Sequence, residues 1–95
     1  MMNEKEQRVI KQVFLSGIAQ GMSYYPRKQA QKKIVLQVIA SNFSRNQKFT
    51  EKQINEVIKQ FWPDFVTIRR DLFEFQFMNR TDDGSEYWLI DQEEE

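Results

Sequence analysis

Residues 49–88 read FTEKQINEVIKQFWPDFVTIRRDLFEFQFMNRTDDGSEYW, and the order of patterns in this stretch decides the fold. A capping-box pattern at 50–53 precedes an apolar run with helical spacing, which predicts a helix over 51–61. A Trp-Pro pair ends that helix, because the residue before a proline avoids the helical conformation. The aspartate that follows suits the N-cap of a second helix, which we expect over 64–75.

A hairpin is predicted after this pair of helices. Two β-prone runs flank the Asp-Gly pair at 83–84, which indicates a hairpin over 77–90. Residues 48–50 are too short for a helix and predict a brief strand. Helix, tight turn, helix and hairpin in this order are typical of a winged helix-turn-helix, with 64–75 as recognition helix and 77–90 as wing. We therefore expect that fold over residues 43–88.

Two further helices are expected upstream. An asparagine N-cap and apolar pairs four residues apart predict a helix over 3–19. A second helix, over 27–42, begins polar and basic and becomes apolar almost all round, which is typical of a central helix. The fold class is thus mainly α with a small β-hairpin (α+β). We divide the chain into an N-terminal helix and connection (1–23), a winged-helix-like domain (24–90) and an acidic tail (91–95).

Composition excludes several classes of site. The 95 residues fit one domain, and the chain contains neither cysteine nor histidine. Disulfides and thiolate metal sites are therefore excluded, and the commonest general base is missing. The acids around Gly84 lack the spacing of a calcium loop, so we expect no metal, no cofactor and no enzymatic activity. Without a signal-type or membrane-spanning apolar run, we expect a cytoplasmic protein with no membrane contact.

Charge is distributed unevenly along the chain. Residues 24–80 hold eleven Lys and Arg against five Asp and Glu, a net +6, whereas 81–95 hold seven acids and no base, a net −7. The basic segment favours an anionic partner. The acidic tail is a candidate to cover that basic surface and compete with such a partner. The overall isoelectric point near 6.3 argues against tight, autonomous binding to DNA.

Several stretches are similar to the bacterial domain-of-unknown-function family 2087. They are Tyr25-Pro26 with the basic residues after it, FTEKQIN at 49–55, Asp64 with IRRDL at 68–72, and Asn79-Arg80 with DGSEYW at 83–88. The family pattern resembles YTE-x-E-V-N, then D-x-x-x-L-R-R-x-L, then R-x-x-x-G-x-x-Y. Three positions depart from it without altering the expected fold: Phe49, Gln53 and Ile68. The family sometimes occurs joined to helix-turn-helix regulators of the arsenic-repressor type, which implies a link to transcription but supplies no mechanism.

Duplex DNA is the first partner that the pattern predicts. Thr67 and Arg70 lie opposite the apolar stripe of 64–75, where an arginine can reach guanine or a phosphate. Other basic side chains would flank the short strand and the wing: Arg45, Lys48, Lys52 and Arg80. The acids Asp71 and Glu74 on the same helix oppose this interpretation. Arg69, at the edge of the stripe, is expected to pair with Glu51 or Glu56 instead.

The alternative is a protein-interaction or dimerisation module with no DNA binding of its own. The apolar N-terminal helix motivates it, because its apolar residues exceed what a short helix needs to dock. The candidate contacts with a second copy or another regulator are Val9, Val13, Phe14, Trp62 and Phe73.

Overall fold

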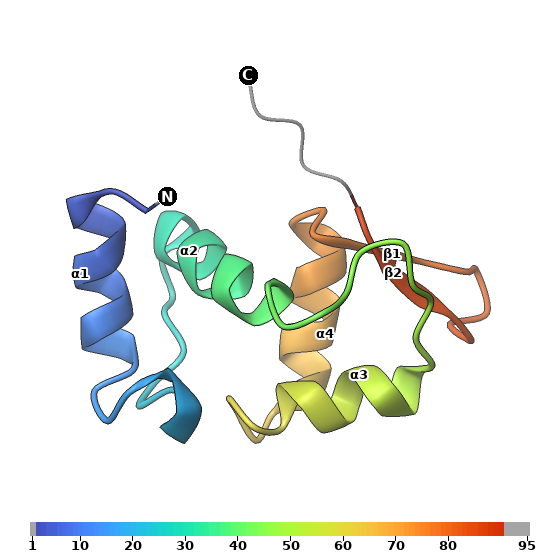
Figure 1. Ribbon diagram of the computed structural model, residues 1–95, viewed down its shortest axis with the longest axis horizontal. Helices are drawn as coiled ribbons and strands as arrows, with labels where there is room; N and C mark the ends of the chain where they lie inside the picture. The colour runs from blue at the N-terminus through green and yellow to red at the C-terminus, as the bar shows by residue number, and fades with distance from the viewer. Residues whose placement is uncertain (1, 91–95) are drawn as a thin grey trace.

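The structure, a computed structural model, describes residues 2–90 (Figure 1). Within that range the chain forms four α-helices, a short 3₁₀ turn and a two-stranded antiparallel sheet, so the expected α+β class is confirmed. The elements are α1 (Glu4–Val13), η1 (Ile18–Gln20), α2 (Gln29–Ala40), α3 (Glu51–Ile58), α4 (Phe65–Glu74), β1 (Met78–Arg80) and β2 (Tyr87–Leu89). The tail at 91–95 lies outside the described residues.

Three helices begin at the N-caps that the sequence predicts. Asn3 and Thr50 each form a capping box with the residue three positions on, and the Thr50 hydroxyl accepts the Gln53 N–H at 3.1 Å. The Asp64 carboxylate likewise accepts the Thr67 N–H at 3.2 Å. Each cap satisfies backbone donors that a first turn leaves unpaired.

The helix ends differ from the expected ones. α1 stops at Val13 rather than 19, because Phe14 leaves the helical region and Gly17 follows with φ 93°. α3 stops at Ile58 rather than 61, because its last turn tightens and the Phe61 N–H bonds to the Ile58 carbonyl. The remaining two helices are each a little shorter than predicted, with α2 beginning after an extended lysine at position 28.

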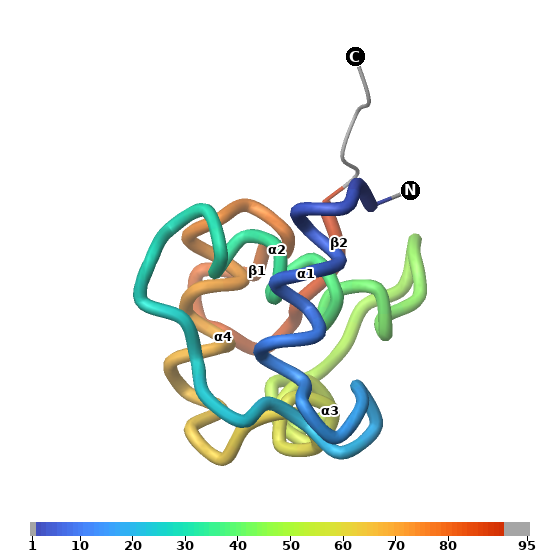
Figure 2. Tube along the Cα trace, turned by 90° about the vertical axis from the view of Figure 1, so that its left-hand side faces the viewer, coloured from blue at the N-terminus to red at the C-terminus, as the bar shows by residue number. Residues whose placement is uncertain are grey.

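Helix α2 is the centre of the core. It lies between α1 and α4 and packs against both (Figures 1 and 2). The largest fully buried side chains come from all four helices and β1: Leu36, Ile39, Ile54, Ile58, Ile68, Leu72, Met78, Val13 and Val35. Each such aliphatic side chain contributes about 1.5–3 kcal/mol when it leaves water. The apolar character of α2 on nearly every side is thus explained by neighbours on several sides.

The β-hairpin lies at the end of the molecule opposite α1 (Figure 1). β1 and β2 pair in the register Met78↔Leu89, Asn79↔Trp88 and Arg80↔Tyr87. Phe49 forms one isolated bridge to Tyr87, with both N–H···O bonds at 2.8 Å. The strand expected at 48–50 is therefore reduced to a single residue pair. Gly84 in the connection has φ 71°, as the Asp-Gly signal requires.

A polar contact ties α4 to the segment before α2. The Tyr25 hydroxyl donates a 2.7 Å hydrogen bond to Asp71 Oδ2, and Lys32 Nζ lies 4.0 Å from the same oxygen. Burial, and then the hydrogen bond to Asp71, raise the pKa of Tyr25, so the phenol stays protonated as a donor. Asp71 thus faces α2 and not the outer side of α4.

We expect Tyr25→Phe to lower the free energy of unfolding by about 1.5–3 kcal/mol, because it leaves a largely buried carboxylate without its closest donor. Tyr24→Phe is the matched control, since that exposed hydroxyl makes no hydrogen bond within residues 2–90. Urea denaturation followed by circular dichroism measures both. Equal stabilities of the two variants would contradict the assigned role.

Candidate functional site

A pocket of about 380 Å³ opens between α4, the first residue of α3 and the hairpin. Three arginines line it, Arg69 and Arg70 from α4 and Arg80 from β1. Three carboxylates line it too, so the formal charge of the lining is zero. The pocket is the place where the outer side of α4 meets the hairpin, and the state of each charged group decides what it can bind.

Arg69 is a structural residue at this site. Its Nη1 donates a 2.5 Å hydrogen bond to Asn55 Oδ1, and its Nη2 lies 3.6 Å from Glu51 Oε1. The side chain is only 17% exposed. Of the two carboxylates proposed from the sequence, Glu51 is the partner.

Glu51 also receives a donor from the sheet. The Tyr87 hydroxyl donates a 3.3 Å hydrogen bond to Glu51 Oε2. Burial, and then the neighbouring Glu51 charge, raise the pKa of Tyr87, which keeps the phenol protonated. The Glu51 carboxylate of α3 therefore contacts both Arg69 of α4 and Tyr87 of β2 at the pocket.

Arg80 holds the hairpin against α4. Its guanidinium carbon lies 5.0 Å from the Phe73 ring centroid, a cation–π contact. Its Nη1 donates 3.3 Å hydrogen bonds to the Thr81 and Asp82 carbonyls. Arg80 was predicted to contact DNA, and one nitrogen of its guanidinium, Nη1, is used within the hairpin. Phe73, predicted to face a partner, is half-buried beside this guanidinium.

Arg70 is the available guanidinium of the three. It is exposed and forms no hydrogen bond or ion pair within residues 2–90. Its charge reaches the Asp64 carboxylate, whose pKa is lowered first by the hydrogen bonds from Thr67 and only last by Arg70. Thr67 was predicted to contact DNA alongside Arg70. Its hydroxyl donates a 2.7 Å hydrogen bond to the Asp64 carboxylate, and it does not line the pocket.

The other predicted basic residues lie outside the pocket. Arg45 and Lys52 are exposed and unpaired within residues 2–90. Lys48 Nζ lies 4.0 Å from Glu86 Oε2 and 5.9 Å from the Trp88 ring centroid, beside the hairpin. The structure therefore brings Arg70 and Arg80 together in one pocket and leaves Arg45, Lys48 and Lys52 outside its lining.

The predicted partner contacts on α1 are buried in the chain itself. Val9, Val13 and Phe14 belong to the common core, and Phe14 packs edge-on to Phe61 with ring centroids 6.5 Å apart. Their apolar side chains pack against the core that α1 shares with α2, so they do not form an exposed surface for an external partner. Trp62 is half-buried against the same core.

Part of the pocket was not predicted. Asp83, Gly84 and Tyr87 were expected only as part of the hairpin, yet all three line the pocket with Glu51. One signal did contain them: the resemblance motif R-x-x-x-G-x-x-Y matches Arg80, Gly84 and Tyr87. The motif residues gather at one place in space, which linear spacing does not reveal.

Neither a membrane-spanning helix nor a cluster of metal ligands is found within residues 2–90. No helix among them is long and apolar enough to cross a membrane. In the same range, no three His, Cys, Asp or Glu side chains are grouped so that they could hold a metal ion.

The pocket's outer edge depends on an ionised aspartate. The Asp83 carboxylate accepts hydrogen bonds from the Thr81 hydroxyl at 2.7 Å, the Ser85 hydroxyl at 2.8 Å and the Ser85 N–H at 3.0 Å. These bonds lower the pKa of Asp83 to about 2. A lowered folded-state pKa stabilises the fold above the unfolded value of about 4, and this stabilisation is lost as pH falls toward 2.

We expect Asp83→Asn to lower the melting temperature at neutral pH, and the gap from the wild type to close as pH falls from 5 to 2. Thermal unfolding across that pH range measures it. Asp82→Asn is the control, because the Asp82 carboxylate makes no hydrogen bond within residues 2–90. A gap that stays constant with pH would refute the role of ionised Asp83.

Comparison with known proteins gives one match. The model of a family described as uncharacterized protein conserved in bacteria, domain of unknown function 2087, matches residues 21–89. Neither the curated proteins nor the solved structures give a match. The matched residues include every element from α2 to β2, and therefore the whole pocket.

Proposed function

We propose that the chain, which belongs to the bacterial domain-of-unknown-function family 2087, binds duplex DNA as a transcription-related winged helix. In this proposal α4 is the recognition helix and the β1–β2 hairpin is the wing. The observation that carries it is Arg70, an exposed guanidinium without a partner in residues 2–90, on the outer side of α4 and beside the hairpin.

The arrangement of elements supports the proposal. α3 and α4 pack against each other across a short connection, and the hairpin follows α4 directly. The Phe49–Tyr87 bridge adds the segment before α3 to the hairpin as a minimal third strand. A recognition helix with an adjoining hairpin places one element toward a groove and the other toward the backbone.

The chemistry of the exposed bases supports it as well. A guanidinium such as Arg70 can bind guanine O6 and N7 as a pair of acceptors, or grip a phosphate. Lys52, in the first turn of α3, and Arg45, in the loop before it, are exposed and unpaired within the described chain. Each such cation adds a salt-dependent phosphate contact.

The acidic residues oppose DNA binding less than their number suggests. Asp71 faces Tyr25 and Lys32, and Glu51 is engaged by Arg69 and Tyr87. Asp64 caps α4 through Thr67. On the outer side of α4 this leaves Glu74 as the exposed carboxylate without such a role.

The alternative, a dimerisation or partner-binding module without DNA binding, retains weaker support. Its main motive was the apolar side of α1, which is buried in the core. The exposed apolar residues nearby are Leu15 and Ile18, in the turn after α1. A stable dimer in light scattering, with no DNA shift at low salt, would favour this alternative.

We expect Arg70→Ala to weaken binding to short mixed-sequence duplexes about tenfold, from the ~1–3 kcal/mol that such a contact supplies. If the contact is to phosphate, the slope of log affinity against log salt also falls by about one. Fluorescence anisotropy at several salt concentrations measures both quantities.

The matched control is Lys11→Ala. It removes the same charge from an exposed position of α1, which lies at the opposite end of the molecule from the hairpin (Figure 1). Its affinity should stay within about twofold of the wild type, because a distant charge is largely screened. Absence of wild-type binding at low salt, or equal losses in the two variants, would refute the proposal.

A further inference from the structure

The pocket has features that contact with a DNA groove does not require. It is concave, with the nearly buried Tyr87 and Arg69 among its lining residues. Its volume of about 380 Å³ lies within the range of small-molecule sites. A helix that only contacts a groove needs an outward surface and gains nothing from a recess beside it.

The ionic groups of the lining differ in availability. Glu51 is shared by Arg69 and Tyr87, and Asp83 is committed to the Thr81 and Ser85 donors of the hairpin connection. The whole guanidinium of Arg70 remains, together with the donors of Arg80 that do not reach the hairpin carbonyls. The free hydrogen-bonding groups thus include planar donors suited to a carboxylate or phosphate.

The balance of charge selects among anions. Arg69, Arg70 and Arg80 are offset by Glu51, Glu74 and Asp83, which gives a lining charge of zero. An ion with two negative charges would therefore meet three carboxylates with no excess of positive charge to compensate. A single negative charge, placed at Arg70 and away from Glu51, Glu74 and Asp83, is the better match.

The pocket also offers apolar surface. Val66 lies in the first turn of α4 with 50% of its surface exposed, and it lines the pocket one helical turn from Arg70 and two from Phe73. Phe73 lies beside Arg80, so its ring extends this apolar wall toward the hairpin. An apolar body attached to the anion would be covered by Val66 and Phe73.

We propose that this pocket binds a small organic monoanion, a carboxylate on an aromatic or aliphatic body. The carboxylate binds Arg70, and the body lies against Val66 and Phe73. Binding of the ligand does not rest on the proposed function. Because Arg70 would serve both, a bound ligand competes with DNA wherever DNA binding also holds.

Titration of the ¹⁵N-labelled chain with benzoate, followed by NMR, tests the proposal. We expect the amides of Arg70, Phe73 and Gly84 to shift, with the α1 amides unchanged. Acetate has the carboxylate without the aromatic ring, and benzyl alcohol has the ring without the charge. Both should therefore bind at least about tenfold more weakly than benzoate. Inorganic phosphate, largely a dianion above neutral pH, should also bind more weakly. Benzoate binding no tighter than any of these three probes overturns the proposal.

Variants locate the site. Arg70→Ala should weaken benzoate binding about tenfold, since it removes the charged donor. Val66→Thr keeps the side-chain shape but replaces a methyl group with a hydroxyl, and it should weaken benzoate binding while leaving acetate binding unchanged. Lys11→Ala should leave benzoate affinity unaltered. Equal losses in Arg70→Ala and Lys11→Ala place binding elsewhere and refute the assignment.

The outcomes separate the two proposals. Benzoate binding without any DNA binding refutes the proposed function and leaves the ligand site standing. DNA binding without benzoate binding refutes the ligand site and leaves the proposed function standing. If both bind, benzoate should reduce the anisotropy of labelled duplex in the wild type. Simultaneous, independent binding would contradict the shared use of Arg70.

Discussion

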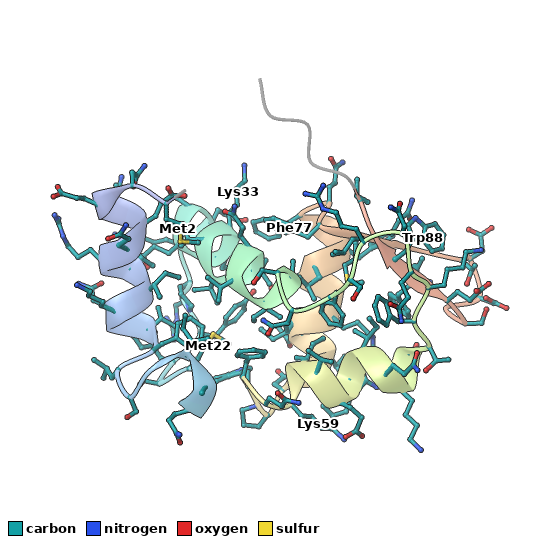
Figure 3. All side chains as sticks on the ribbon, in the orientation of Figure 1. Met2, Met22, Lys33, Lys59, Phe77 and Trp88 are labelled. Carbon is teal, nitrogen blue, oxygen red and sulfur yellow. The ribbon has the colours of Figure 1, made fainter. Side chains whose placement is uncertain are left out.

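Helix α2 must be covered on nearly every side, and much of the structure follows from this constraint. From Ile34 to Ala40 its side chains are apolar except for Gln37, so exposing any face of that half would cost several kcal/mol. α1 covers one side and α4 another, which places the N-terminal helix in the same core as the matched family region. Met22, labelled in Figure 3, is buried in this shared core and donates its N–H to the Phe61 carbonyl at 2.8 Å.

At the pocket, the ion pair between Arg69 and Glu51 fixes geometry more than it adds stability. The Glu51 side chain is 45% exposed, so its ion pair with Arg69 adds little to global stability. Its effect is positional, because the same carboxylate receives the Tyr87 hydroxyl and so sets the distance between α4 and the hairpin. Arg80 on Phe73 fixes the same distance from the outer side. The pocket exists because both contacts hold the hairpin beside α4 without filling the space between them.

Arg70 is where the two proposals meet. The neighbouring Arg69 is engaged by Glu51 and Asn55, and Arg80 is partly engaged by the hairpin carbonyls, whereas the Arg70 guanidinium has no hydrogen bond or ion pair within residues 2–90. A groove of DNA and a small carboxylate both offer it planar acceptors. The zero charge of the lining limits how many phosphates can bind at the pocket itself, so strong DNA binding would depend on exposed cations outside it, Arg45 and Lys52 among them.

The sequence by itself determined the fold class, the three helix starts at Asn3, Thr50 and Asp64, and the positive φ at Gly84. These features depend on contacts within about one turn of backbone, and so the local pattern contains them. Only the tertiary structure decided which side Asp71 faces, through a partner 46 residues away, and that Val9 and Phe14 lie inside the core. The local sequence pattern could not predict the pocket either, because residues 51 and 87 meet there only through the packing of α3, α4 and the hairpin. Residue spacing encodes the face of each helix, but the neighbour that covers that face is chosen by how the elements pack.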